Sequence, residues 1–136
     1  HPFEGHIQQK RYAIEQARFD YVLSLDADEE LSPELQDSIR QAKTNWAHDC
    51  YFMNRMSNIG DRWIRHGGWY PDRKMRLFDR RCFRVGGVNP HDKFIPAPGA
   101  STTHLPGDIL HHTNADLNSR VQTINNFSTL LERVLF

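Results

Sequence analysis

The chain has 136 residues, of which 38% are hydrophobic and 25% are charged, an ordinary composition for one soluble globular domain. Its 17 basic and 17 acidic residues balance, so the net charge gives no reason to expect a nucleic-acid or acidic-membrane partner. Cys50 and Cys82 form no CxxC pair, which favours reduced core thiols and leaves one disulfide open. No apolar run approaches the roughly 20 residues that cross a bilayer, and no signal peptide is visible. These features together predict a cytoplasmic protein.

The first third of the chain alternates between helical and strand-like patterns. Residues 4–18 carry apolar side chains at helical spacing and predict a helix. The short β-rich run Tyr21–Leu25 predicts a buried strand. Ser32, as N-cap, and Pro33, as the first helical residue, predict the start of a second helix. This alternation predicts an α/β fold with a mixed, mostly parallel sheet flanked by helices.

The rest of the chain reads as short strands followed by one long helix. Strand candidates lie between Gly, Pro and Asp residues, at 50–56, 74–78, 82–88 and 108–112. Residues 114–136 have apolar side chains at helical spacing and predict a long C-terminal amphipathic helix. We expect this helix to pack on the sheet or on another copy, and contact with the inner face of the cytoplasmic membrane is the alternative. The whole chain is expected to be a single domain.

A cluster of acids follows the first strand. Asp26 and Asp28 are two residues apart, so both can point at one hard cation at the end of a strand. Mg²⁺ and Mn²⁺ take one or two carboxylates and fill their other positions with phosphate oxygens and water. The alternative is that these acids only stabilise the N-terminus of the next helix, where the helix dipole favours negative charge. That would explain Glu29 or Glu30, but Asp26 is too far upstream of the helix. A calcium loop fails because Leu31 stands where such a loop needs glycine.

Four sequence blocks resemble glycosyltransferase family 2. SLDADE (24–29), preceded by QQKRYAIEQA, is similar to the metal-binding DxD region of that family. RHGGWYPDRKMRLF (65–78), VNPHDK (88–93) and LPGDILHH (105–112) match further blocks in the same order. The closer likeness is to bacterial lipopolysaccharide-core glucosyltransferases, and it covers nearly the whole chain. It implies a GT-A fold and an inverting transfer of sugar from a nucleotide-sugar donor to a glycan or lipid-linked acceptor, in cell-envelope polysaccharide or lipopolysaccharide synthesis.

Two features depart from the family pattern. The block that usually reads VHEK is NPHDK here, with Asp92 where Glu is usual. The family begins with βα units that bind the nucleotide base and ribose, whereas this chain opens without Met at the helix before the DxD strand. We therefore expect the C-terminal, metal- and acceptor-side portion of such an enzyme, inactive alone. We also expect a homodimer or larger assembly that covers the exposed edge of the strand at Tyr21–Leu25.

The resemblance also implies a metal site. Asp26 and Asp28 would bind Mn²⁺ or Mg²⁺, and His111, which follows a late strand, would be a further ligand or a contact to the diphosphate. A structural histidine is an equally good alternative for His111. His112 should face the opposite way, because neighbouring strand residues alternate.

Glycosyl transfer further needs a base for the acceptor hydroxyl. Asp92 is the candidate base, His91 lies next to it to orient it, and Asp72 is the reserve. A loop ion pair with Lys93 is the alternative for Asp92.

The segment after His66 holds the candidate substrate-binding residues. Trp69 and Tyr70 would lay an aromatic face against a sugar ring, although loop packing is the commoner reason for such a pair. Arg73, Lys74 and Arg76 would meet phosphate. Alternation along a strand places Lys74 and Arg76 on one face and Arg73 on the other.

Two other classes of function remain open. A non-catalytic fragment or binding module would keep the same fold without turnover. A metal-dependent phosphoryl-transfer enzyme is the weaker alternative, because the sequence has no Gly-rich phosphate loop with its lysine.

Overall fold

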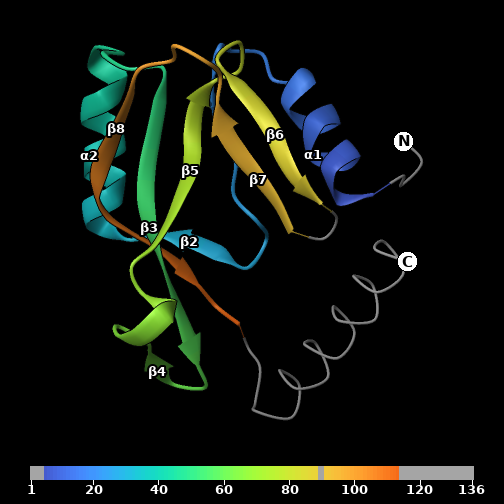
Figure 1. The fold of residues 1–136 in the computed structure, drawn as a ribbon. Helices are drawn as coiled ribbons and strands as arrows, with labels where there is room; N and C mark the ends of the chain where they lie inside the picture. Colours follow the sequence, from blue (N-terminus) through green and yellow to red (C-terminus); the bar gives the residue numbers. More distant parts are fainter. Residues whose placement is uncertain (1–4, 89–90, 114–136) are drawn as a thin grey trace.

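The structure, a computed structural model, describes residues 5–88 and 91–113. The helix expected at 114–136 lies outside these residues. In chain order they form α1 (His6–Glu15), β1 (Tyr21–Leu23), β2 (Glu29–Leu31), α2 (Pro33–Thr44), β3 (Cys50–Ile59), β4 (Arg62–Trp63), the short 3-10 helix η1 (Gly67–Trp69), β5 (Asp72–Asp79), β6 (Phe83–Val88), β7 (His91–Pro96) and β8 (Thr102–His111) (Figure 1). No helix in the described part of the chain is long and apolar enough to cross a membrane.

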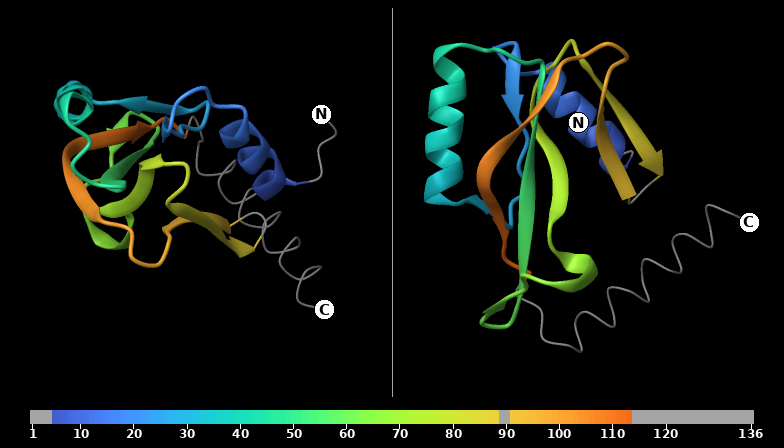
Figure 2. Two further views of the ribbon diagram at one scale, coloured as in Figure 1. Left: turned by 90° about the horizontal axis from the view of Figure 1, so that it is seen from above. Right: turned by 60° about the vertical axis from the view of Figure 1, so that its left-hand side comes forward.

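A curled sheet occupies the centre, in the order β1-β5-β3-β8-β2, with β4 paired to β3. A separate two-stranded sheet is formed by β6 and β7. The two helices lie on opposite sides, α2 against β8 and α1 beside the β6–β7 hairpin (Figure 2). These layers confirm a mixed α/β fold.

The expectation of a mostly parallel sheet is wrong for the described strands. Within residues 5–88 and 91–113, only β3 and β8 pair in parallel, and the other pairings are antiparallel. Parallel pairing needs a long crossover. The chain between β3 and β8 supplies one, because β4 to β7 intervene, whereas shorter connections return β5 beside β3 in the antiparallel sense.

The first strand differs from its predicted setting. Tyr21–Leu23 is half-buried and lies at the end of the sheet, paired only with β5 among the described strands. Its outer edge pairs with no other strand in the described part of the chain, which agrees with the open strand edge that the sequence predicts. One residue of β1 packs through its aromatic ring: Tyr21 stacks on Trp46, with the two ring centroids 3.9 Å apart.

Three of the described strands, β2, β4 and β7, were missed by the sequence patterns. β2 contains Glu29 and Glu30, and acidic residues are depleted in strands. It forms because it pairs with the end of β8, with Glu29 opposite His111. β4 has only two residues and pairs with β3. β7 ends at Pro96 and pairs with β6.

Helix α2 begins where the sequence predicts. The Ser32 hydroxyl accepts a hydrogen bond from Leu35 N at 3.2 Å and another from Asp108 N at 3.0 Å. The backbone of β8 passes close to this first turn at Gly107, which has φ 95°. A Cβ at Gly107 would collide with the backbone of Leu35. The start of α2 is therefore held by β8 as well as by its own cap.

Apolar side chains fill both sides of the sheet. One core joins α2 to the sheet through a set of residues that includes Leu35, Met53 and Ile109. The other includes Ile14 of α1, Cys50 and Phe78. Cys50 and Cys82 are free thiols, as the sequence favours, and burial raises the pKa of Cys50 to about 11.

Candidate functional site

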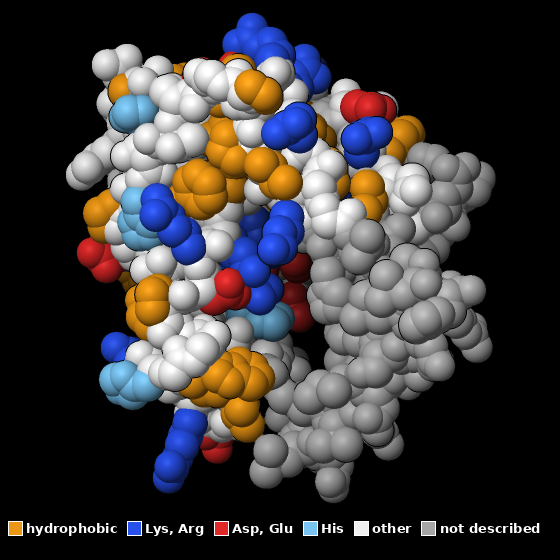
Figure 3. All heavy atoms as spheres, in the orientation of Figure 1, with side chains coloured by type: hydrophobic (Ala, Val, Ile, Leu, Met, Phe, Trp, Pro, Cys, Tyr) orange, Lys and Arg blue, Asp and Glu red, His pale blue; other side chains and the backbone are white. Residues whose placement is uncertain are grey.

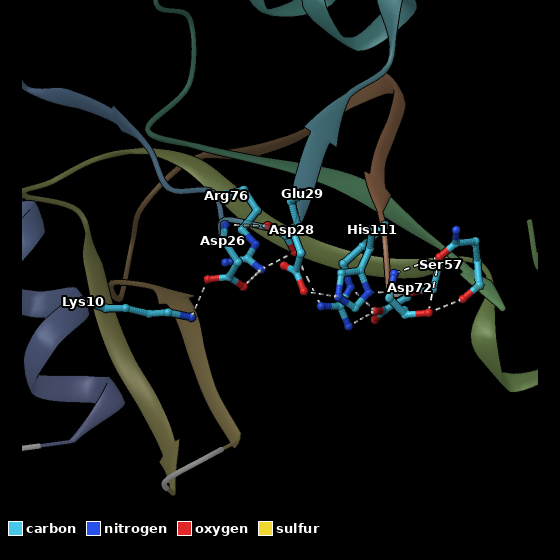
Figure 4. A network of polar contacts seen from close by, with 11 residues as sticks. Lys10, Asp26, Asp28, Glu29, Ser57, Asp72, Arg76 and His111 are labelled. Atoms are coloured by element: carbon cyan, nitrogen blue, oxygen red, sulfur yellow. Dashed lines mark hydrogen bonds and ion pairs between the residues drawn. The ribbon is translucent and has the colours of Figure 1, made fainter. Parts of the chain in front are cut away.

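The acidic segment lies where β2 meets the end of β8. The chain turns between β1 and β2, with Glu29 N donating to Asp26 O at 3.0 Å. His112 N donates to Asp28 O at 2.9 Å, which ties this turn to β8. The acids consequently face residues that are far away in the sequence (Figure 4).

Arg76 is the cation among these acids. One of its terminal nitrogens, Nη2, donates to Glu29 Oε1 at 2.7 Å and to Asp26 Oδ2 at 2.9 Å. The Arg76 residue is only 6% exposed, and the Glu29 side chain is fully buried. The buried Arg76 Nε–H has no hydrogen-bond partner in the described part of the chain.

A β-bulge places Arg76 here. Tyr51 pairs with Leu77 and Phe52 pairs with Met75, so Arg76 is an extra residue of β5 between two regular pairs. A bulge bends its strand and redirects the side chain of the extra residue. The bulge interrupts the strict alternation of side chains that the sequence predicts between Lys74 and Arg76.

The ion pairs continue on both sides of Arg76. Lys10 of α1 lies 3.2 Å from Asp26, and Arg55 of β3 lies 3.5 Å from Glu29. Partial burial favours a raised pKa for Asp26, but the charges and hydrogen bonds of Arg76 and Lys10 outweigh it and hold that pKa below its usual range. Asp26 is therefore ionised and engaged by two cations.

Asp28 faces a different partner, His111. The distance from His111 Nε2 to Asp28 Oδ2 is 3.2 Å. On the other side of the ring, His111 Nδ1 lies 2.9 Å from the Ser57 hydroxyl oxygen. Ser57 and His111 are opposite one another in the parallel β3–β8 pair, and Ser57 is buried. The imidazole is thus fixed between a buried hydroxyl and an exposed carboxylate.

Ser57 is a site residue that the sequence patterns missed. Ser57 belongs to no recognisable sequence motif. It reaches His111, 54 positions later in the sequence, only because β3 and β8 pair in the structure. His112 turns away from this pair, as alternation predicts, and its Nε2 lies 3.1 Å from Glu30 Oε2.

The side chains of Asp28 and His111 fit a metal with few protein ligands. No set of three His, Cys, Asp or Glu side chains converges on one point within residues 5–88 and 91–113. One carboxylate and one imidazole are nevertheless suitable donors, and Mg²⁺ or Mn²⁺ commonly completes its shell with phosphate oxygens and water. Asp26 as a ligand stays a prediction, and it would have to leave Lys10 and Arg76.

The candidate bases lie in different surroundings. Asp72 is held by Arg55 Nη2 at 2.9 Å from Oδ2 and by Lys74 Nζ at 3.0 Å from Oδ1. The structure describes only the backbone of His91 and Asp92, and this backbone is part of β7 in the separate β6–β7 sheet. Their roles, and the alternative pair of Asp92 with Lys93, stay predictions.

The predicted substrate-binding residues divide by their contacts. Trp69 is 45% exposed. The Tyr70 hydroxyl donates to Asp108 Oδ1 at 2.8 Å, and this hydrogen bond raises the pKa of Tyr70. Arg73 lies over the Phe52 ring, 4.9 Å from its centroid. It is on the opposite side of β5 from Lys74, which pairs with Asp72. Tyr70 thus anchors its loop, and a role of Trp69 in sugar binding stays a prediction.

Comparison with known proteins gives one consistent result. A protein of Rickettsia prowazekii named an uncharacterized glycosyltransferase is 30% identical over 131 residues, which are 93% of this chain and 40% of that protein. Proteins of the same description from Rickettsia typhi and Rickettsia conorii are 29% identical over 131 residues and 30% identical over 126 residues. No family model matches the chain.

The similarity therefore extends over the site but not over the whole relatives. This chain spans about two fifths of the length of the curated relatives it matches. It is similar over nearly all its own residues to proteins named as glycosyltransferases.

Proposed function

We propose that this chain is the metal- and acceptor-side portion of a glycosyltransferase. The observation that carries the proposal is the Asp28–His111 pair, 3.2 Å apart, where the DxD segment meets the end of β8. The named relatives support a sugar-transfer activity in general. The sequence blocks support the finer assignment: family 2, inversion, a nucleotide-sugar donor, and an acceptor in cell-envelope or lipopolysaccharide synthesis.

In this proposal Asp28 and His111 hold Mn²⁺ or Mg²⁺ beside the donor diphosphate. The ion would offset the negative charge that develops on the departing diphosphate. Ser57 contributes by fixing the ring: when Nδ1–H donates to its hydroxyl, Nε2 keeps its lone pair and faces Asp28. The carboxylate and the imidazole are then held in place before the donor arrives, which lowers the entropic cost of binding it.

Other residues receive proposed roles around this pair. Asp92 takes the proton of the acceptor hydroxyl and His91 orients it, since both oxygens of the reserve base Asp72 are engaged by cations. Trp69 offers its exposed ring to a sugar. Lys74, half-buried beside Asp72, is the proposed phosphate contact.

Binding of Mn²⁺ tests the site directly. In an electron paramagnetic resonance titration with Mn²⁺ and UDP, Asp28→Asn and His111→Ala should abolish saturable binding. Glu30→Gln is the matched control, because this neighbouring acid pairs with His112 instead. Equal binding by the wild type and Asp28→Asn would exclude the assignment.

Variants of Ser57 test the positioning of the ring. Ser57→Ala should weaken Mn²⁺ binding by about 10–100-fold, as loss of a partner behind a metal ligand does. Ser57→Thr keeps the hydroxyl and should restore binding. The nitrogen chemical shifts of His111 should report a changed tautomer balance in Ser57→Ala alone, whereas a purely structural role would leave them unaltered.

A thermal-shift series distinguishes the function classes. Stabilisation by a UDP-, GDP- or CMP-sugar that requires Mn²⁺ is the result expected of a transferase. Absence of any shift would favour a binding module that retains the fold, and a response to plain nucleoside triphosphates would favour phosphoryl transfer.

A further inference from the structure

A cavity lies away from the Asp28–His111 pair, between α1 and the start of β6. Its volume is about 580 Å³, and its walls include Arg11, Arg80, Arg81 and Arg84. This volume falls within the range of small-molecule sites, which is about 300–1,000 Å³. Figure 3 shows Lys and Arg side chains gathered at the top of the molecule, over the β5–β6 turn and the end of α1.

Two of these arginines are anchored by the protein itself. Arg81 Nη2 lies 2.6 Å from Asp79 Oδ2 and 3.6 Å from Asp20 Oδ2. Arg80 Nη1 donates to the backbone oxygen of Ala17 at 3.0 Å. These contacts hold one side of the cavity in place at its junction with the β5–β6 turn.

The other two arginines line the cavity from different elements. Arg11 belongs to α1 and Arg84 to β6, and both are exposed. Neither arginine forms an ion pair with an acidic residue in the described part of the chain. Among the described residues of the cavity wall, Glu15 is the only acid. Two guanidinium groups are therefore available to a ligand.

Apart from the arginines and Glu15, the residues of the wall are apolar. Ile14 is 5% exposed, and Phe83 and Val85 are half-buried beside it. Guanidinium groups bind phosphate oxygens in pairs of hydrogen bonds. An apolar wall next to them favours a ligand whose phosphate is attached to a hydrocarbon or ring.

We propose that this cavity binds a phosphate group carried by a molecule with an apolar portion. Arg11 and Arg84 contact the phosphate, and Ile14 and Val85 contact the apolar portion. Arg80 and Arg81, which are paired with Asp20 and Asp79, form a fixed side of the cavity. A soluble phosphate ester and the headgroup of an anionic lipid share this chemistry. The proposal is independent of the Mn²⁺ site and does not depend on the transferase assignment.

Calorimetric titration of the chain with inorganic phosphate and with short-chain phosphatidic acid tests the proposal. The lipid analogue should bind more tightly than phosphate. Arg11→Gln combined with Arg84→Gln should lower its affinity on the order of tenfold or more, since charge-assisted hydrogen bonds are lost. Arg62→Gln with Arg65→Gln, two exposed arginines outside the cavity, is the charge-matched control and should bind as the wild type does.

Two further experiments test the role of the apolar wall and identify where the phosphate ligand comes from. Val85→Thr has nearly the same volume and should reduce the preference for the lipid analogue over phosphate. Flotation with phosphatidylcholine vesicles, with and without phosphatidic acid, separates a membrane headgroup from a soluble ester, and either result supports the site. Absence of binding, equal affinity for phosphate and the lipid analogue, or equal losses in both double variants would overturn it. Circular dichroism melts confirm that every variant is folded.

Discussion

At the scale of single residues, the buried Arg76–Glu29 pair is the contact most sensitive to change. Its two side chains are 7% and 0% exposed. Arg76→Met should lower the free energy of unfolding by roughly 3–5 kcal/mol, because buried Glu29 would lose its short ion pair and keep only the longer contact to Arg55 and a hydrogen bond from Asp26 N. Replacing both residues by Met should recover most of this loss. Urea unfolding measures each variant.

The control for that experiment is an ion pair in water. Arg40 and Asp37 lie 2.8 Å apart with side chains 69% and 71% exposed. Arg40→Met should cost less than about 1 kcal/mol. A loss in Arg76→Met no larger than this would show that Glu29 does not depend on its cation.

The carboxylates also predict how stability depends on pH. A hydrogen bond from Arg81 holds the pKa of Asp79 below its usual range, and Arg76 and Lys10 outweigh burial to lower the pKa of Asp26. A group whose pKa is lower in the folded state stabilises the fold above its unfolded pKa, about 3.9 for Asp. Stability should therefore be constant near neutrality and should fall as the pH drops below about 4. Urea midpoints measured from pH 7 to pH 3 test this, and Asp79→Asn should flatten the acid limb.

At the scale of elements, Gly107 links β8 to the first turn of α2. Gly107→Ala should destabilise the fold by roughly 1–3 kcal/mol, through a positive φ and a collision with the backbone of Leu35. Gly99 has φ 81° but open space around it. Gly99→Ala therefore carries the backbone strain alone, and thermal melts of the two variants separate the two causes. Equal losses would mean that the close approach of β8 to α2 contributes nothing.

At the scale of the whole molecule, the outer edge of β1 is open to another chain. β1 ends the order of the described sheet, and Leu25 just after it is 36% exposed. Unpaired apolar strand edges associate readily. We expect light scattering to show a dimer or larger species at micromolar concentration, and Leu25→Lys to shift it toward the monomer. Ile95→Lys, at a residue 38% exposed in β7, is the control, and a monomeric wild type would contradict the prediction.

Much of the fold was predictable because its signals are local. The start of α2 follows from Ser32 and Pro33, whose capping chemistry needs only the next few residues. α1 and the strands β3, β5, β6 and β8 were predicted from spacing and β-rich composition, with ends that differ by a few residues. β2 was not, because pairing with β8 overrides the low strand propensity of its acids.

In the candidate site, too, some features follow from the local sequence and others only from the tertiary structure. The sequence by itself determined which residue types are present: the acids of the DxD segment, the late His111, and the arginines that follow the HGGWYPD loop. The tertiary structure decided their partners, since Arg76 reaches Asp26 across 50 positions and His111 reaches Asp28 across 83. It also decided that Arg76 stands at a bulge and that Ser57 fixes the ring of His111. Strand register and bulges depend on the packing of distant segments, and no local spacing records them.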